Sequence, residues 1–182
     1  LGRMIVLKEN LLDESERATQ SIRALLIEDN PGDVLLLRQM LRRFTAPPIE
    51  LHNVERLAEA YQQLTKQSFD IILLDLTLPD SQGFATFEQL HQQVFQIPIV
   101  VLTGFDDEEL ALRAVRAGAQ DYLVKGEINV QLLMRAIRYA IERKRTETTL
   151  RESQMRYRAL FENANTGIFL ITPNGRYLNL NQ

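Results

Sequence analysis

Short apolar runs alternate with longer amphipathic segments between residues 22 and 125. The five runs are IRALLI (22–27), IELHNV (49–54), FDIILL (69–74), IPIVVL (97–102) and DYLV (121–124). The first, third and fourth are nearly continuous in aliphatic residues, which is typical of β-strands covered on both faces. We therefore expect five strands in this part of the chain.

The segments between these runs carry apolar residues at helical spacing. They lie at 33–44, 57–64, 84–94 and 107–118, and the last ends at Gly118, a residue that suits a helix C-terminus. Strands that alternate with helices favour a parallel sheet with right-handed crossovers. The pattern predicts an α/β fold with a doubly wound, five-stranded parallel sheet.

From residue 129 the pattern becomes helical and stays so. The apolar stripe that can pack on the sheet consists of Val130, Leu133, Ile137 and Ala140. Beyond Ile141 the stripe thins into RKRTETT, which no core could hold. We therefore expect the last helix of the domain to continue as a connector, over 128–160.

Whether this connector pairs with a second copy is left open by its sequence. Ile141, Thr148 and Met155 fall seven residues apart, which is the heptad spacing of a two-stranded coiled coil. Lys144 and Arg151 interrupt that seam.

A second, shorter pattern follows the helix. GIFLIT reads as a strand, PNG (173–175) as a tight turn and RYLNLN as a returning strand. One hairpin cannot bury a core alone. We expect the chain to stop inside a domain, and the natural protein to be longer.

Composition narrows the class of protein. The 182 residues are 45% hydrophobic and 25% charged, as in globular proteins, and no apolar run has the length of a membrane span. The lack of cysteine excludes disulfides, Cys-ligated metals and thiol nucleophiles, and fits a reducing cytoplasm. Residues 1–20 read as a leader of uncertain origin that lacks the features of a secretory signal.

Charge is unevenly spread along the chain. Residues 128–160 hold eight Arg or Lys and three Glu, which gives this segment a net charge of +5. Because the whole chain has a net charge of −3, the rest of the chain carries −8. The overall charge gives no case for nucleic-acid binding. We interpret the positive segment as a solvated helix face, because its charges are mixed.

Polar residues collect where the predicted strands end. Open parallel sheets bind ligands at the carboxyl ends of their strands. The residues at these ends are Glu28, Asp29, Asp75, Thr103, Gly104 and Lys125. Three carboxylates, a hydroxyl and an amine thus converge on one edge from four strands.

The chemistry of this set points to phosphoryl transfer. Three close carboxylates stay ionised most easily around a cation, and oxygen ligands without His or Cys favour Mg²⁺. Thr103 and Lys125 are donors suited to phosphoryl oxygens. Asp75, held at the end of an apolar strand, is then best read as a nucleophile that forms an acyl phosphate.

Four motifs carry a resemblance to a known family. They are LLIEDNPGD (25–33), LLDLTLPDSQG (73–83), VVLTG (100–104) and DYLVKG (121–126). With their spacing, residues 21–127 resemble the receiver domain of a bacterial two-component response regulator. The resemblance implies a flavodoxin-like sheet of order 2-1-3-4-5 and a cytoplasmic signalling module. It also implies that Asp75 accepts a phosphoryl group from a sensor histidine kinase or a phosphotransfer protein.

The same resemblance assigns further roles. Mg²⁺ would be held by Asp29, Asp75 and the Thr77 carbonyl, with Glu28 acting through water. Thr103 would bond a phosphoryl oxygen and Lys125 would pair with it. Whether such a module counts as an enzyme is left open, since it would catalyse only its own phosphorylation and dephosphorylation.

Thr103 and Tyr122 fall at the family's switch positions. Phosphorylation would favour one arrangement of these residues and so bias the surface made by 107–118, 121–124 and the helix after 129. Many relatives form dimers through that surface, so we expect a homodimer through it, through the connector, or both. We expect no nucleic-acid or membrane partner for this segment.

The sequence departs from the family at two positions. Glu28 stands where Asp is commonest, which is a mild change. Gly126 stands where the family usually has proline, which leaves the conformation of 124–127 open.

The end of the chain carries a second resemblance. Leu160, Phe161, Glu162 and Asn163, followed by the predicted hairpin, look like the start of a PAS sensor domain. The expected layout is a leader (1–20), a receiver (21–127), a connector (128–160) and a truncated PAS start (161–182).

Three other functions remain as alternatives. A phosphohydrolase with an aspartyl intermediate normally has an acid two residues after its nucleophile, where this chain has Thr77. A flavin or nucleotide module needs a phosphate loop, whereas EDNPGD (28–33) would repel phosphate. A receiver-like adaptor or dimerisation module that is never phosphorylated would not need the whole set of polar residues.

Overall fold

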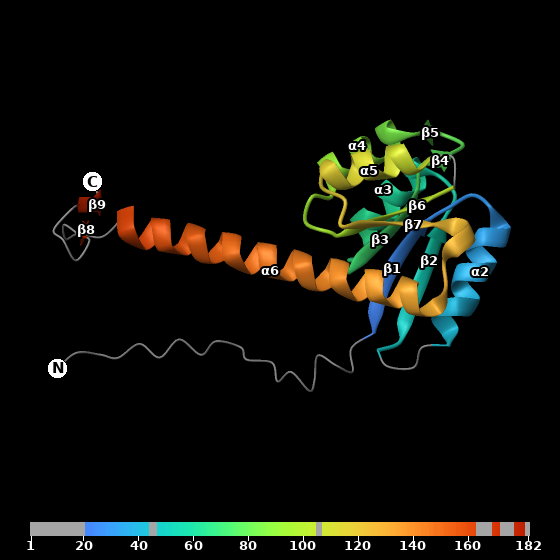
Figure 1. Ribbon diagram of the computed structural model, residues 1–182, viewed down its shortest axis with the longest axis horizontal. Coiled ribbons are helices and arrows are strands. Elements are labelled where there is room, and N and C mark those ends of the chain that lie inside the picture. The colour runs from blue at the N-terminus through green and yellow to red at the C-terminus, as the bar shows by residue number, and fades with distance from the viewer. Residues whose placement is uncertain (1–20, 44–46, 105–106, 163–168, 172–176, 181–182) are drawn as a thin grey trace. The chain divides into compact units, whose positions relative to one another are not determined.

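A five-stranded parallel sheet organises the first part of the molecule (Figure 1). The computed structural model describes residues 21–43, 47–104, 107–162, 169–171 and 177–180. The strands of this sheet are β1 (Ile22–Ile27), β2 (Ile49–Val54), β3 (Ile71–Asp75), β6 (Ile99–Thr103) and β7 (Asp121–Val124). Their order, β2-β1-β3-β6-β7, confirms the predicted doubly wound, flavodoxin-like arrangement.

Two strands begin later than their apolar runs suggest. Ile97 and Pro98 precede β6 because proline has no N–H to donate to a neighbouring strand. Phe69 and Asp70 precede β3, and the Asp70 carboxylate accepts the backbone N–H of Arg23 at 2.8 Å. Both strands extend one residue further at their carboxyl ends, which brings Asp75 and Thr103 into the sheet itself.

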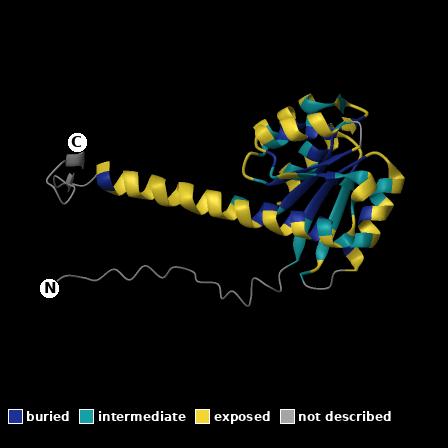
Figure 2. Cartoon of the chain, in the orientation of Figure 1, coloured by how far each residue is buried: buried dark blue, intermediate teal, exposed yellow. Residues whose placement is uncertain are grey.

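Helices cover both faces of the sheet (Figure 1). The helices of this layer structure are α2 (Pro31–Arg42), α3 (Leu57–Lys66), α4 (Phe84–Gln93), α5 (Glu108–Arg116) and α6 (Val130–Glu162). The core on one face joins the sheet to α3, α4 and α5, and the core on the other joins it to α2 and α6. β3 and β6 are buried throughout (Figure 2), as their continuous aliphatic runs predict.

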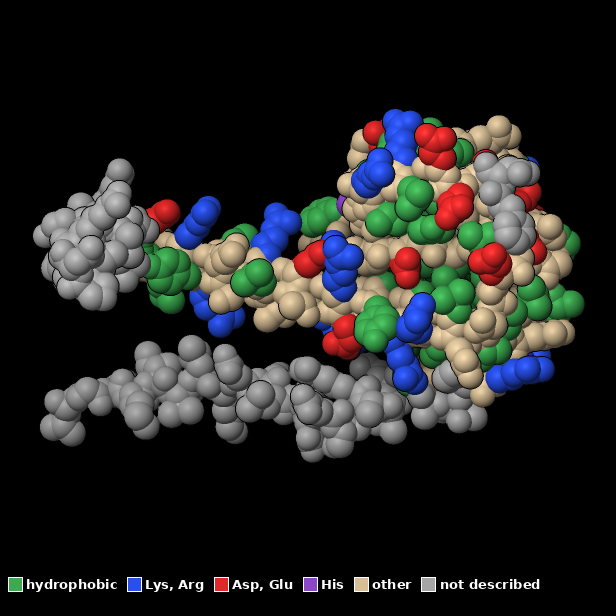
Figure 3. All heavy atoms as spheres, in the orientation of Figure 1, with side chains coloured by type: hydrophobic (Ala, Val, Ile, Leu, Met, Phe, Trp, Pro, Cys, Tyr) green, Lys and Arg blue, Asp and Glu red, His purple; other side chains and the backbone are tan. Residues whose placement is uncertain are grey.

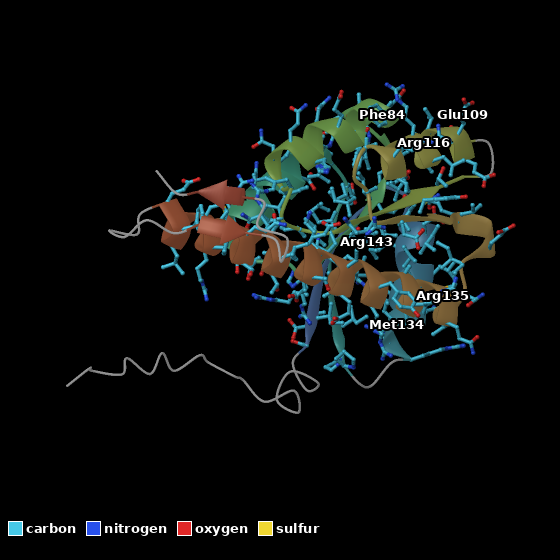
Figure 4. The ribbon with its side chains drawn as sticks, turned by 60° about the vertical axis from the view of Figure 1, so that its left-hand side comes forward. Phe84, Glu109, Arg116, Met134, Arg135 and Arg143 are labelled. Atoms are coloured by element: carbon cyan, nitrogen blue, oxygen red, sulfur yellow. The ribbon has the colours of Figure 1, made fainter. Side chains whose placement is uncertain are left out.

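Helix α6 changes character along its length. Its first turns bury Leu133, Ile137 and Ala140 against the sheet. Met134 is buried while its neighbour Arg135 is exposed; Figure 4 labels both. Ile141 is also buried in this core, so it is not available to the seam that Ile141, Thr148 and Met155 would form.

The chain divides into two compact units, residues 1–141 and 142–182. In the second unit, helical residues 142–160 are mostly exposed, and Glu142 pairs with Arg145 at 3.3 Å. Strands β8 (Phe169–Ile171) and β9 (Tyr177–Leu180) pair in antiparallel fashion, as the hairpin pattern predicts. The predicted turn at 173–175 and the leader at 1–20 lie outside the described residues. Among the helices that the structure describes, none is long and apolar enough to span a membrane.

Candidate functional site

The strand ends bring the predicted polar residues to one edge of the sheet. β1 leads into Glu28 and Asp29, β3 ends in Asp75, β6 ends in Thr103 and β7 leads into Lys125. The parallel pairing of β3 with β1 and β6, and of β6 with β7, sets these ends side by side. The sequence therefore predicts the location of the site from strand order alone.

Lys125 lies at the centre of this edge. Its Nζ is 2.7 Å from Glu28 Oε2, 2.8 Å from Asp75 Oδ2 and 2.9 Å from Asp33 Oδ2. Asp33, in the first turn of α2, was not among the residues predicted from strand ends. Its position inside the motif EDNPGD was the only signal that could have found it, because a helix residue does not follow from a strand-end argument.

Both oxygens of the Asp75 carboxylate have donors. Oδ1 accepts the backbone N–H of Thr77 at 3.0 Å, and Oδ2 accepts from Lys125. The residue is only 7% exposed. A carboxylate held from two sides at the end of a buried strand has a fixed orientation, which a nucleophile requires.

Glu28 is fully buried. Its Oε1 accepts the N–H of Asn30 at 3.0 Å, whereas its Oε2 contacts Lys125 as an ion pair without the geometry of a hydrogen bond. Burial is the main cause that raises the pKa of Glu28 to about 7. The Lys125 ammonium opposes that shift, and the nearby Asp75 charge adds to it.

The same partners act in the opposite sense on Lys125. Burial by itself lowers the pKa of this ammonium, but its contacts with the carboxylates of Asp75, Glu28 and Asp33 outweigh burial and raise the pKa above its ordinary value. Lys125 therefore stays charged at any physiological pH.

Three carboxylates at this edge fit a divalent cation. Glu28, Asp29 and Asp75 each offer an oxygen, and the three oxygens lie within 4.8 Å of one another. The Glu28 Oε2 atom, buried without a hydrogen bond, is the kind of group that a cation or its water would satisfy. An all-oxygen set suits Mg²⁺.

Thr103 and Tyr122 have partners of their own. Thr103 is buried, and its hydroxyl donates to the Gly104 carbonyl at 3.2 Å. The Tyr122 hydroxyl donates to Glu108 Oε1 at 2.7 Å, at the start of α5. This hydrogen bond is the main cause that raises the pKa of Tyr122 above its ordinary value, with burial adding to it.

A small hairpin supports the segment after Asp75. Its strands are β4 (Thr77–Leu78) and β5 (Ser81–Gln82), and the Gly83 N–H that follows donates to the Leu76 carbonyl at 2.8 Å. Thr86, fully buried on α4, also donates to that carbonyl, at 3.1 Å. Neither bond follows from the strand pattern, since both depend on how the hairpin folds back.

The hairpin also reaches α3. The carboxylate of Asp80 accepts the N–H groups of Leu57 and Ala58, both at 3.0 Å, and thereby caps a helix whose own N-cap residue makes no such bond. Burial tends to raise the pKa of Asp80, but the hydrogen bonds from Ala58 and Leu57 outweigh it and lower the pKa.

The conformation after β7 was left open by the sequence. Residues Lys125–Glu127 form a single 3₁₀ turn, with Gly126 inside it. Lys125 is thus the first residue of a turn that begins where the strand ends, and its side chain reaches back over the sheet edge.

Comparisons with known proteins agree with this geometry. A family model described as the response regulator receiver domain matches residues 24–138. The gliding motility regulatory protein of Myxococcus xanthus is 32% identical over 122 residues, which make up 66% of this chain and 15% of that protein. The C4-dicarboxylate transport transcriptional regulatory protein DctD of Pseudomonas aeruginosa is 34% identical over 126 residues, or 66% of this chain and 25% of that protein.

A solved structure matches over the same part. The signal receiver domain of an HD domain-containing protein from Pseudomonas fluorescens Pf-5 has a TM-score of 0.63 and 27% identity, covering 72% of this chain and 94% of that chain. The chain spans a quarter or less of the length of the two curated relatives above.

Proposed function

Because this chain belongs to the response regulator receiver family of two-component signalling, we propose that Asp75 is its phosphorylation site. The donor is a sensor histidine kinase or a phosphotransfer protein. The observation that carries this proposal is the Asp75 carboxylate, fixed by the Thr77 N–H and by Lys125, beside the acidic residues Glu28 and Asp29.

In the proposed step, a carboxylate oxygen of Asp75 attacks the phosphorus of a phosphohistidine. The new P–O bond forms as the P–N bond breaks, and the electron pair leaves with the imidazole nitrogen. Lys125, already 2.8 Å from Asp75 Oδ2, moves with the phosphoryl oxygens and balances part of their charge. Thr103, at the end of the neighbouring strand, supplies a hydroxyl donor.

The family binds Mg²⁺ at its acidic pocket, and this chain has residues to hold one. Asp29 and Asp75 are the proposed direct ligands, with the Thr77 carbonyl, and Glu28 acts through a water. When bound, the ion supplies positive charge that reduces repulsion between the carboxylates and an incoming phosphoryl group.

Signal transmission is proposed to pass through Thr103 and Tyr122. A Thr103 hydroxyl that turns to the phosphoryl group must leave the Gly104 carbonyl. A Tyr122 ring that turns inward must leave Glu108, at the start of α5. Either change alters the surface formed by α5, β7 and the first turns of α6.

We place a homodimer contact on that surface and on the connector. The exposed residues Leu150, Tyr157 and Leu160 are spaced by seven and three residues, which is the a-a-d spacing of a coiled-coil seam. Apolar side chains alternate with Lys and Arg along this part of α6 (Figure 3). This register replaces the one through Ile141, which the core already buries.

The proposed domain layout keeps the receiver at 21–127, the connector at 128–160 and the start of a PAS domain at 161–182. The antiparallel pair β8–β9 supports this assignment of the last segment. In this arrangement, phosphorylation changes how two connector helices meet, and that change reaches the PAS segment or an output region.

Intact mass after incubation with acetyl phosphate and Mg²⁺ tests the proposed function. We expect a gain of about 80 Da, one phosphoryl group, which is absent with excess EDTA and in Asp75→Ala. A wild-type protein that gains no mass and also fails to bind beryllofluoride would contradict phosphorylation and favour the adaptor alternative.

A further inference from the structure

Asp33 contacts Lys125 across 92 residues of sequence. It lies in the first turn of α2, where acidic residues usually serve the helix N-terminus. Here Asn30 already caps the helix, because its Oδ1 accepts the Gly32 N–H at 2.9 Å. The Asp33 carboxylate is instead directed to the lysine of the phosphorylation site, 2.9 Å from its Nζ.

Among the described residues, three carboxylates surround the ammonium group of Lys125. An ammonium group carries three N–H bonds, and three carboxylates lie within 2.9 Å of this one. Once Asp75 is phosphorylated it is no longer a free carboxylate, and several phosphoryl oxygens take its place beside the ammonium. These oxygens compete with Asp33 and Glu28 for the N–H donors of Lys125.

Exposure decides which contact is lost most cheaply. The side chain of Glu28 is 0% exposed and that of Asp75 is 10% exposed, whereas that of Asp33 is 29% exposed. A carboxylate that faces water can be rehydrated when its partner leaves, while a buried one is left as an uncompensated charge. Asp33 is also not one of the three residues whose oxygens converge to fit a cation.

We propose that Asp33 is a positioning residue, which holds Lys125 in the unphosphorylated protein and is exchanged for a phosphoryl oxygen when Asp75 is phosphorylated. The inference rests on the proposed function of Asp75. It makes the first turn of α2 sensitive to the phosphorylation state and makes Asp33 a competitor of the phosphoryl group for Lys125.

The test is a double-mutant cycle read by beryllofluoride affinity at saturating Mg²⁺. Asp33→Asn removes the competitor, so beryllofluoride should bind about twofold to fivefold more tightly, the range expected for a partly exposed ion pair. Asp33→Glu, which keeps the charge, should return the affinity toward wild type. The matched control Asp121→Asn, at the start of β7 and thus at the opposite end of that strand from Lys125, should leave it unchanged.

The same Asp33→Asn change is then made in a Lys125→Met background. There the proposal predicts no effect on affinity, because Asp33 acts only through Lys125. A gain of the same size in both backgrounds would mean that Asp33 acts as bulk charge, and would overturn the proposal.

A second readout follows the exchange itself. The ¹³C resonance of the Asp33 carboxyl should move, when beryllofluoride binds to wild type, to the position that it has in Lys125→Met. A resonance that does not move would contradict the exchange even if wild type binds beryllofluoride normally. Wild type that binds no beryllofluoride would instead contradict the proposed function, and the inference with it.

Discussion

At the scale of single residues, burial has its clearest effect on the carboxyl group of Glu28. It has no exposed surface, and Lys125, its ion-pair partner among the described residues, is shared with Asp33 and Asp75. Burial outweighs the opposing effect of the Lys125 ammonium, and the nearby Asp75 charge adds to burial, so the pKa of Glu28 rises.

This raised pKa gives a pH-dependent prediction for the metal-free protein. The pKa of Glu28 is about 7 in the folded state against 4.5 as its ordinary value, so the folded state binds the proton more tightly. Its contribution to stability is therefore fully present below about pH 4.5 and is lost as the pH rises through 7. Between pH 5 and pH 8 in EDTA, Glu28→Gln should gain on the order of 2 kcal/mol relative to wild type in urea unfolding.

The control for this experiment is Glu50→Gln, which removes an exposed carboxylate on β2. Any general effect of removing a carboxylate is read from this variant over the same pH range. A Glu28→Gln gain no larger than that of this control would contradict the assigned role of burial.

The sequence predicted most of the residues at this edge of the sheet, but not all of the residues that contact them. Asp75, Glu28, Asp29, Thr103 and Lys125 were all predictable, because the carboxyl ends of parallel strands must meet at one edge. Asp33 and Asp80 were not, since each acts on an element distant in sequence through a side-chain direction that periodicity does not encode.

At the scale of elements, the β4–β5 hairpin connects β3, the strand that ends in Asp75, to a neighbouring helix. Asp80 accepts two N–H groups at the start of α3, so it serves as the cap that the helix lacks in its own sequence. The hairpin is thereby tied to α3, and it is tied to α4 by the hydrogen bond between the hydroxyls of Thr86 and Ser81, at 2.9 Å.

Asp80→Ala should lower the free energy of unfolding by about 1 kcal/mol, the usual cost of a lost N-terminal cap. Asp107→Ala is the matched control, because Asp107 also precedes a helix but its side chain makes no cap bond. Equal losses for both variants in urea unfolding would argue against the cap.

The lowered pKa of Asp80 adds a pH test. The contribution of Asp80 to the free energy of unfolding is present above about pH 3.8 and is lost as the pH falls through its folded-state pKa.

Gly118 fixes how α5 ends. Its φ of 118° is unfavourable for residues with a side chain, and a Cβ there would lie 2.5 Å from His91 Nε2 on α4. The glycine that the sequence suggested as a C-terminal signal thus also permits the close approach of α4 and α5. The same two helices meet where Arg113 lies 4.0 Å over the Phe84 ring; Figure 4 labels Phe84.

Gly118→Ala should destabilise the domain by about 1–3 kcal/mol, from backbone strain together with the contact to His91. Gly104→Ala is the comparison, because an added Cβ there would meet nothing within 4 Å. In thermal unfolding, adding His91→Ala to Gly118→Ala should recover only part of the loss, because the backbone strain remains. Full recovery would mean that the contact alone matters.

At the scale of the whole molecule, helix α6 belongs to two environments. Ile141 lies in the core of the first unit, while Leu150 and Leu160 in the second unit are exposed. The sequence predicted where the apolar stripe thins, but not that the core takes up Ile141. The burial of that side chain shows this, and it removes Ile141 from any seam along the connector.

The proposed dimer seam predicts a selective effect of charge. Leu150→Glu should reduce the dimer fraction of the beryllofluoride-bound protein in analytical ultracentrifugation, because it puts like charges opposite one another in the seam. Met155→Glu is the matched control, since Met155 is equally exposed and apolar but lies off the a and d positions set by Leu150 and Tyr157. Equal losses from both variants, or none from either, would contradict this register.

Reductive trapping tests directly whether Asp75 carries an acyl phosphate. Wild-type protein is treated with acetyl phosphate and Mg²⁺, reduced with borohydride, digested and sequenced by mass spectrometry. Borohydride converts an aspartyl phosphate to homoserine, so we expect homoserine at position 75 and unchanged aspartate at positions 29 and 33. Homoserine at another aspartate, or at none in a protein that has gained phosphoryl mass, would contradict it.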